Sequence, residues 1–282
     1  AGKPVELPHI DIFCDGTAVR RAGDHTFEPC RQLIDEFTTV TNEEVCAAIQ
    51  IYWEHLRCIP EPAGAMGLAG LLKDRKELKD KNALVVLCGA NMDFGRLAWI
   101  ARHAGIGAQR RRYFRFEIGE HSGTLLHLAE VILEGINIIE FQYGKTDPER
   151  AWPVIAFEAS PADLDLLDRR LAEEGIPHDD VTSQEDVEFR VIRYNPGLFN
   201  LPLFIKLDFP EREGALYDFL YRVRGNANIC YFNYAFSGEE IGRALIGLEF
   251  ENNDDREQFK KRLEESGFRF RFISQDVMDR IA

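Results

Sequence analysis

Leu84-Val85-Val86-Leu87-Cys88-Gly89-Ala90-Asn91-Met92-Asp93-Phe94 is the stretch that decides the fold of the first part of the chain. Four apolar residues end in a small nucleophilic side chain and a glycine. This pattern predicts a buried parallel strand that runs into a tight turn and then a helix. Such turns lie at the carboxyl edge of a sheet, where open α/β folds hold their ligands. The alternative interpretation is a core strand that simply ends at a glycine.

Strands and helices are predicted to alternate around this stretch. Short strands are expected at 10–14 and 38–40, and helices are expected from about 24–26, from a Thr41 or Asn42 cap, over 63–72 and over 94–103. The helix over 63–72 is apolar on nearly all sides, which predicts that it is buried. Alternation of this kind indicates an α/β layer arrangement.

Composition limits the classes of partner. The 282 residues carry a net charge of −14, which argues against a nucleic-acid partner because phosphate binding needs clustered Lys and Arg. No apolar run approaches the roughly 20 residues of a membrane span. The six cysteines form no CxxC pair, and the seven histidines form no HExxH motif or Cys/His cluster. We therefore expect reduced thiols, no disulfide framework and no metal site.

The second part of the chain repeats itself. Eight residues recur 91 positions later with the same identity. They are Glu120, Gly123, Leu125, Asn137, Ile138, Phe141, Tyr143 and Glu158, matched by Glu211, Gly214, Leu216, Asn228, Ile229, Phe232, Tyr234 and Glu249. The tails 183–185 and 274–276 also correspond, as Ser-Gln-Glu and Ser-Gln-Asp. A repeat this long indicates a duplicated domain rather than a solenoid.

Each copy predicts the order βαββαβ, the split ferredoxin-like motif. In the first copy we expect strands at 114–118, 136–143 and 154–158 and a charged helix over 161–174. In the second copy the corresponding strands are 204–209, 227–236 and 244–250, and the helix is 254–266. Asn195-Pro196-Gly197 is the expected joint between the copies.

Three motifs give the chain a family resemblance. Glu61-Pro62-Ala63-Gly64-Ala65 and Asp15-Gly16-Thr17-Ala18-Val19 accompany Cys88-Gly89-Ala90-Asn91. With the duplicated module, the chain resembles the C-terminal half of biosynthetic threonine dehydratase (threonine ammonia-lyase). The resemblance implies an α/β part of a pyridoxal-phosphate domain of the tryptophan synthase β-like type, followed by α+β tandem ferredoxin-like, ACT-like domains. The implied boundaries are 1–107, 108–197 and 198–282.

The resemblance also implies roles for individual residues. Cys88 would meet the pyridine nitrogen of pyridoxal phosphate, at a position where threonine dehydratases usually carry serine and serine dehydratases carry cysteine. Glu61 would line the cofactor pocket, and the backbone at Gly16 and Gly89 would border the cofactor. The structural alternatives are a packing thiol at Cys88 and a helix-terminus charge at Glu61.

The Schiff-base lysine of the resembled family is expected to be absent. The S-x-K-x-R-G-A motif that carries it does not occur, and the nine lysines all have polar or surface-like sequence neighbours. No catalytic residue is therefore assigned to this chain, which we expect not to deaminate threonine alone. An N-terminal half, as a separate chain or a severed piece, would have to supply the lysine and complete the large domain.

The ACT-like copies are predicted to bind an amino-acid effector, isoleucine or also valine. In such domains the glycine turn after the first strand and the start of the next strand form a small apolar niche. The candidates are Gly123, Leu125 and Asn137 in the first copy and Gly214, Leu216 and Asn228 in the second, flanked by His121, Ile138, Arg212 and Ile229. The alternative is that these turn glycines and strand-entry asparagines serve the fold alone.

Three functional hypotheses remain at this point. The first is the C-terminal portion of a threonine dehydratase that converts L-threonine into 2-oxobutanoate and ammonia for isoleucine biosynthesis. The second is a stand-alone amino-acid-sensing subunit without catalysis, and the third is a relic with a structural role. The resemblance further implies a homotetramer in the cytoplasm, or in an organelle stroma or matrix of a eukaryote.

Overall fold

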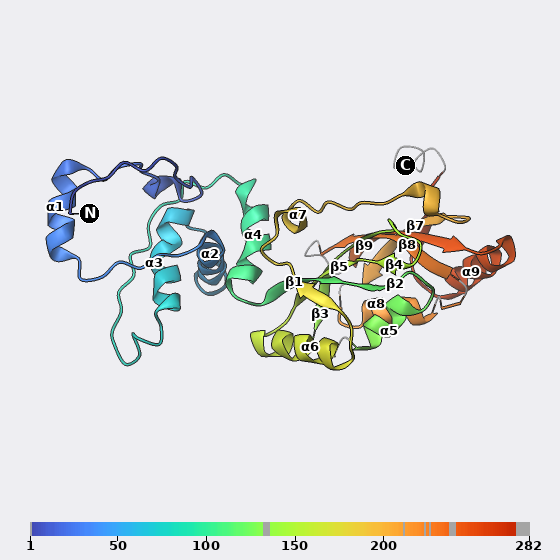
Figure 1. Ribbon diagram of the computed structural model, residues 1–282. Helices are drawn as coiled ribbons and strands as arrows, with labels where there is room; N and C mark the ends of the chain where they lie inside the picture. The colour runs from blue at the N-terminus through green and yellow to red at the C-terminus, as the bar shows by residue number, and fades with distance from the viewer. Residues whose placement is uncertain are drawn as a thin grey trace. The chain divides into compact units, whose positions relative to one another are not determined.

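The computed structural model divides the chain into two compact units, residues 1–109 and 110–282 (Figure 1). It describes residues 2–131, 136–210, 212–222, 224–225, 227–236 and 241–274. Glu211 of the sequence repeat and positions 275 and 276 of the matching tails lie outside the described residues.

Helices build the described part of the first unit. They are α1 (Asp24–Leu33), α2 (Asn42–Leu56), α3 (Pro62–Lys73) and α4 (Arg96–Gly107), together with the 3-10 turn η1 (Asp15–Thr17). The four α-helices confirm the helices predicted in this region. Side chains from α2, α3 and α4 form its core, which contains Val45, Cys46, Ala48, Ile49, Tyr52, Ala65, Ala69, Ile100 and Ala104.

Helix α2 begins as its sequence predicts. The Thr41 side chain accepts a hydrogen bond from the Glu44 amide at 3.2 Å, and the Glu44 carboxylate accepts one from the Thr41 amide at 2.8 Å. This reciprocal capping box satisfies two backbone donors that a helix start otherwise leaves unpaired.

The predicted strands of the first unit are wrong. Within residues 2–109 the structure contains no strand at 10–14, 38–40 or 84–87, so this unit is not a layered α/β domain. Leu84 and Val86 are 94% and 73% exposed, so the stretch 84–87 is not buried either. A strand forms only beside another strand that shares its hydrogen bonds. The apolar residues are present, but residues 2–109 contain no neighbouring strand.

The second unit contains two successive βαββαβ copies, as the repeat predicted. The first copy consists of β1 (Arg111–Phe116), α5 (Thr124–Val131), β3 (Asn137–Gly144), β5 (Val154–Glu158), α6 (Pro161–Glu173) and β6 (His178–Asp180). The second consists of β7 (Leu203–Pro210), α8 (Ala215–Arg222), β8 (Ala227–Ala235), β9 (Ile241–Phe250), α9 (Asn253–Glu265) and β10 (Phe270–Phe272). Smaller elements are the ribbon of β2 (Ile118–Gly119) with β4 (Arg150–Ala151), α7 (Glu185–Glu188) and η2 (Pro196–Leu198).

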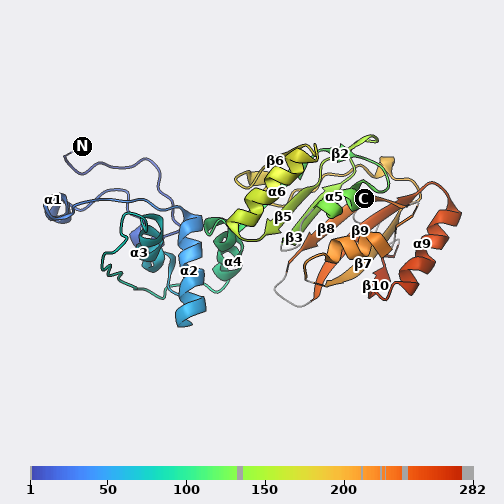
Figure 2. The same cartoon turned by 90° about the horizontal axis from the view of Figure 1, so that it is seen from below.

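The two copies share one antiparallel sheet of eight strands in the order β10-β7-β9-β8-β3-β5-β1-β6. Strands β3 and β8 join them, and Gln142 lies opposite Asn233 in this pair. These two residues are themselves 91 positions apart, so the joint lies on the pseudo-twofold axis that relates the copies. Helices α5, α6, α8 and α9 cover one face of the sheet, the face turned to the viewer in Figure 2.

Candidate functional site

The three sequence motifs of the first unit meet in space. The Glu61 amide donates a hydrogen bond to the Gly89 carbonyl at 3.2 Å, and the Asn91 amide donates one to a Glu61 carboxylate oxygen at 3.1 Å. A Cβ atom on Gly16 would lie 3.1 Å from the Ala63 Cβ and 3.3 Å from Glu61 Oε1. The start of α3 therefore holds the turn after residue 87 on one side and the η1 segment on the other.

Glycines make this close approach possible. Gly89 has φ +77°, and a Cβ there would lie 2.1 Å from the Glu61 carboxyl carbon. A Cβ on Gly64 would lie 1.6 Å from the Cys88 carbonyl oxygen. Only glycine fits at these two positions. The Cys88 side chain is exposed beside them, and the Glu61 side chain is half-buried.

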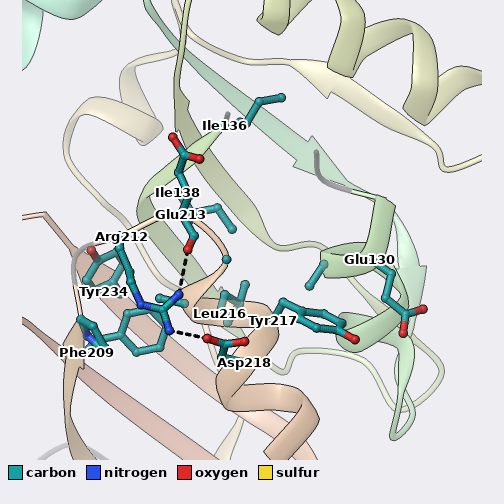
Figure 3. A pocket seen from close by; sticks show the side chains of 14 residues that line it. Glu130, Ile136, Ile138, Phe209, Arg212, Glu213, Leu216, Tyr217, Asp218 and Tyr234 are labelled. Atoms are coloured by element: carbon teal, nitrogen blue, oxygen red, sulfur yellow. Dashed lines mark hydrogen bonds and ion pairs between the residues drawn. The ribbon is translucent and has the colours of Figure 1, made fainter. Parts of the chain in front are cut away.

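In the second unit, a cavity of about 600 Å³ lies between the copies (Figure 3). The turn of the second copy contributes Arg212, Gly214 and Leu216, and the first copy contributes Ile136 and Ile138. Arg212 bonds Asp218 and donates to the Glu213 carbonyl at 3.1 Å, as the dashed lines in Figure 3 show. The lining thus combines aliphatic side chains with positively and negatively charged ones.

The pseudo-equivalent region, at the turn of the first copy, contains much smaller cavities. Gly123, Leu125, Asn228 and Ile229 line a cavity of about 100 Å³, and a second cavity of about 10 Å³ lies next to it. The turn comes from the first copy and the strand start from the second.

Each cavity therefore combines the turn of one copy with the strand start of the other. The sequence grouped the effector candidates within a copy, whereas the structure brings Gly123 and Leu125 together with Asn228 and separates them from Asn137. Gly214 and Leu216 meet the neighbours of Asn137 rather than Asn137 itself, which lines none of the described cavities. The cause is the β3–β8 joint, which sets the strand start of each copy beside the turn of the other.

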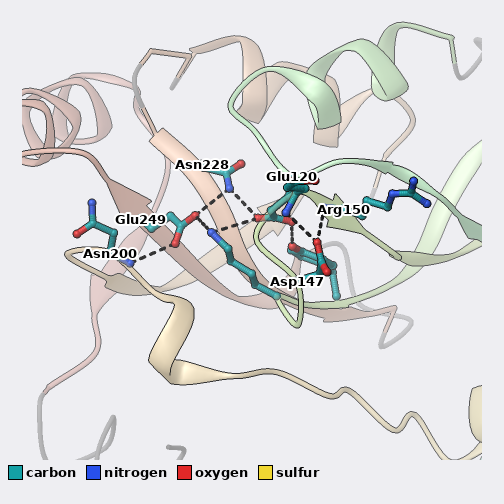
Figure 4. A network of polar contacts seen from close by, with 9 residues as sticks. Glu120, Asp147, Arg150, Asn200, Asn228 and Glu249 are labelled. Carbon is teal, nitrogen blue, oxygen red and sulfur yellow. Dashed lines mark hydrogen bonds and ion pairs between the residues drawn. The ribbon is translucent and has the colours of Figure 1, made fainter.

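A buried polar network lies beside the two small cavities (Figure 4). Lys145 Nζ contacts Glu249 Oε1 at 2.5 Å and Glu120 Oε1 at 3.9 Å. The Asn228 amide donates to Glu120 at 2.7 Å and to Glu249 at 3.0 Å, and the Tyr143 hydroxyl donates to Glu120. The Lys145–Glu249 and Asn228–Glu120 contacts join one copy to the other, and the other three contacts lie within a copy.

Burial sets the chemistry of this network. It raises the pKa of Glu120, although the hydrogen bonds from Tyr143 and Asn228 and the nearby Lys145 charge act in the opposite direction. Burial, and then the bond to Glu120, raise the pKa of Tyr143. The surface-like environment predicted for every lysine is wrong for Lys145, which is 8% exposed. Its burial depends on Glu249, 104 residues away, so no local sequence signal could reveal it.

Metal-binding clusters and membrane-spanning helices are absent from the part of the chain that the structure describes. No group of three His, Cys, Asp or Glu side chains there could hold a metal ion. Among the same residues, no helix has the length and apolar character needed to cross a bilayer.

Family models match nearly the whole chain. Residues 102–191 and 200–280 match the model of the C-terminal regulatory domain of threonine dehydratase, and residues 1–89 match that of pyridoxal-phosphate dependent enzymes. The match to the pyridoxal-phosphate enzyme model does not favour the alternative of a stand-alone sensing subunit.

Individual relatives agree with these models. The chain is 33% identical to the biosynthetic L-threonine dehydratase of Pasteurella multocida, over 99% of this chain and 55% of that protein. It is 30% identical to the chloroplastic biosynthetic threonine dehydratase of Arabidopsis thaliana, over 98% and 47%. A solved structure of processed threonine deaminase isoform 2 from Solanum lycopersicum is 39% identical over 36% of this chain and 30% of that chain, with a TM-score of 0.34.

The chain spans about half the length of the curated relatives that it matches. The regulatory-domain model covers more than half of the chain, and the pyridoxal-phosphate model covers most of the remainder. The chain therefore belongs to the threonine dehydratase family and corresponds to the C-terminal portion of its members.

Proposed function

We propose that this chain forms the C-terminal portion of a pyridoxal-phosphate-dependent enzyme that converts L-threonine into 2-oxobutanoate and ammonia. Residues 1–107 would be part of the cofactor-binding domain, and 108–197 and 198–282 two ACT-like regulatory domains. The observation that carries the proposal is the convergence of Gly16, Glu61 and Cys88-Gly89 in the region that matches the pyridoxal-phosphate enzyme model.

The residues of this cluster fit the cofactor. Pyridoxal phosphate supplies an electron sink that stabilises the negative charge left when the substrate loses its α-proton. The Cys88 side chain is exposed. A thiol, unlike a carboxylate, would leave a pyridine nitrogen beside it largely unprotonated, which suits elimination better than transamination. Glu61 fixes the turn through two backbone hydrogen bonds, and Gly16 and Gly89 leave room where other residues would project a Cβ.

The N-terminal half of the catalytic domain would supply the Schiff-base lysine and cover residues 84–87. Leu84 and Val86 are exposed apolar residues outside any helix or strand, and residues 2–109 contain no strand that could pair with them. A strand from the N-terminal half would satisfy the backbone of this stretch and bury its side chains.

Reconstitution tests the catalytic proposal. The 282-residue chain would be mixed with a polypeptide that corresponds to the N-terminal half of the Pasteurella multocida relative, and native mass spectrometry would follow assembly. We expect a complex that binds pyridoxal phosphate and releases 2-oxobutanoate from L-threonine, whereas this chain alone does neither. Native mass spectra of the same complex also test the homotetramer that the family resemblance implies.

Cysteine variants make the test specific. Cys88→Ser should retain activity in the complex, because a hydroxyl is also neutral, whereas Cys88→Asp should lower it by placing a charge at the ring nitrogen. Cys30→Asp, on the exposed surface of α1, is the matched control and should have no effect. Equal activity of Cys88→Asp and Cys30→Asp would contradict the assigned role of Cys88.

The cavity of about 600 Å³ is the better candidate for the effector, for which isoleucine is the first choice and valine the second. Its volume lies within the roughly 300–1,000 Å³ of typical small-molecule pockets. Ile136, Ile138 and Leu216 suit an aliphatic side chain, while Arg212 and Asp218 carry the charges that an α-carboxylate and an α-ammonium require. Gly123, Leu125 and Asn228 would then belong to the second, smaller niche.

Two pseudo-equivalent variants test the effector site. Arg212 and His121 are 91 positions apart, both are exposed, and each lines its own niche. By calorimetry, we expect Arg212→Ala to weaken L-isoleucine binding by about tenfold or more, because a charged hydrogen bond is lost. His121→Ala should leave binding unchanged. A loss of affinity in His121→Ala alone would move the effector to the other niche.

A further inference from the structure

The two niches are related by the pseudo-twofold axis, so they can be compared position by position. Lys145 corresponds to Phe236, since both follow the strands that join the copies. The Lys145 amide donates to the Cys230 carbonyl at 2.9 Å, and the Phe236 amide donates to the Ile139 carbonyl at 2.7 Å. Cys230 and Ile139 are also 91 positions apart, so the backbone is equivalent at the two positions.

The side chains at these equivalent positions differ in charge. Beside the small niche Lys145 bridges the carboxylates of Glu249 and Glu120, whose side chains are 9% and 2% exposed. Glu120 and Asn228, which Lys145 and its partner Glu249 contact, line the cavity of about 10 Å³. The equivalent position of the second copy carries Phe236, an exposed side chain without charge. The carboxylate equivalent to Glu249 is Glu158, and Arg111 of its own copy pairs with it at 3.0 Å. Glu249, beside the smaller niche, is thus paired with a buried ammonium from the other copy, whereas Glu158 is paired with a guanidinium of its own copy.

We infer that Lys145 is a built-in ammonium ligand that closes the smaller niche, so that each chain has one effector site, the cavity of about 600 Å³. The inference rests on the proposed effector function of that cavity. Two carboxylates, a tyrosine hydroxyl and an asparagine amide form the kind of site that would hold the α-ammonium of a free amino acid. Lys145 occupies that site from within the chain, and a tethered group binds without the entropy loss of a free ligand.

The same contacts explain why Lys145 stays in place. Burying one charge without a partner is costly, whereas Lys145 and Glu249 neutralise each other within one hydrogen-bonded network. An incoming amino acid would have to displace this ammonium and leave it without a partner. The remaining cavities of about 100 and 10 Å³ also offer less room than the open cavity.

Stoichiometry and chemical rescue test the inference on the full 282-residue chain. Calorimetry with L-isoleucine should give one site per chain. Lys145→Ala removes the ammonium and its methylene groups, so we expect a lower thermal midpoint that n-propylammonium chloride raises again. Sodium chloride and tetramethylammonium chloride at equal ionic strength should not raise it, because neither cation donates an N–H hydrogen bond. Phe236→Ala, the matched control, should show no response specific to propylammonium.

Each outcome decides the inference. Two isoleucine molecules per wild-type chain, or a folded Lys145→Ala chain that responds equally to all three salts, would overturn it. Should Lys145→Ala fail to fold, Lys145→Met keeps the volume without the charge. In that case a wild-type count of one site, weakened by Arg212→Ala but not by His121→Ala, still supports the inference. If neither the wild type nor any variant bound isoleucine, the effector proposal would be refuted. Rescue of Lys145→Ala by propylammonium would still support Lys145 as the closing group.

Discussion

At the scale of single residues, the six thiols differ in solvent access and acidity, which predicts their reactivity. Cys30 and Cys88 are exposed, whereas Cys46 and Cys230 are buried. Burial raises the pKa of the Cys46 thiol to about 12 and also raises that of Cys230. The thiolate is the reactive form. We expect iodoacetamide at neutral pH to modify Cys30 and Cys88 first, and Cys46 and Cys230 only after denaturation. Peptide mass spectrometry measures this order, and equal labelling of Cys30 and Cys46 in the folded chain would contradict it.

Glu120 predicts a pH dependence at the same scale. Burial raises its pKa above the ordinary value of 4.5, so the folded state binds the proton more tightly than the unfolded state. The contribution of this carboxyl to stability is therefore largest at low pH and falls as the pH rises from 4.5 through the raised pKa. The free energy of unfolding of the wild type, relative to that of Glu120→Gln, should decrease over this window in urea titrations.

Glu257 provides a control of opposite sign. The hydrogen bond from Lys260 lowers the pKa of this exposed carboxyl. The stability of the wild type relative to Glu257→Gln should therefore be lost as the pH falls, not as it rises. If both differences changed in the same direction with pH, the role assigned to Glu120 would be incorrect.

How far single residues could be predicted depended on the range of their contacts. The motif around Glu61 and Gly64 predicted a helix start held close to its neighbours, and the Cys88 carbonyl does lie against Gly64. The cofactor roles of Glu61 and Cys88 remain predictions. Lys145 could not be recognised, because a lysine in a turn-like sequence becomes buried only when a carboxylate from the other copy lies opposite it.

At the scale of elements, helix α2 depends on its capping box. Thr41→Ala removes the side-chain acceptor for the Glu44 amide and should lower the stability of the first unit by about 1 kcal/mol. Urea unfolding followed by the fluorescence of Trp53 and Trp99, in a Trp152→Phe background, measures this loss. Asn252→Ala removes the cap of α9 in the second unit and should leave the unfolding transition of the first unit unchanged. An equal effect of Thr41→Ala and Asn252→Ala on the stability of the first unit would argue against a local capping contribution.

The same scale explains why helices were predicted better than strands in the first unit. A helix forms its hydrogen bonds within one segment, so the Thr41 cap and the spacing of apolar residues suffice to predict α2. A strand takes its hydrogen bonds from another segment. Residues 84–87 have the composition of a buried strand, but composition could not show whether a neighbouring strand lies within the same unit.

At the scale of the whole molecule, the 91-residue repeat predicted two copies of one motif but not their connection. Residues at β3 and β8 have the apolar pattern of ordinary strands, and nothing local marks them as the pair that joins the copies. The pairing makes one eight-stranded sheet and forms both niches across the copies. The effector candidates were therefore predicted as residues but not in the correct combinations.

This joint predicts that the two copies fold as one cooperative unit. Phe141 of β3 and Phe232 of β8 pack edge to face with ring centroids 4.4 Å apart, and Lys145 pairs with Glu249 across the copies. A fragment of residues 110–282 should unfold in urea with coincident transitions by circular dichroism and by Trp152 fluorescence, because loss of either copy exposes this joint. A fragment of residues 110–197 would expose the β3 edge and deprive Lys145 of its partner Glu249, so it should show no cooperative transition or should aggregate. Two separate transitions in the longer fragment, or a cooperative transition in the shorter one, would show that the copies are independent domains.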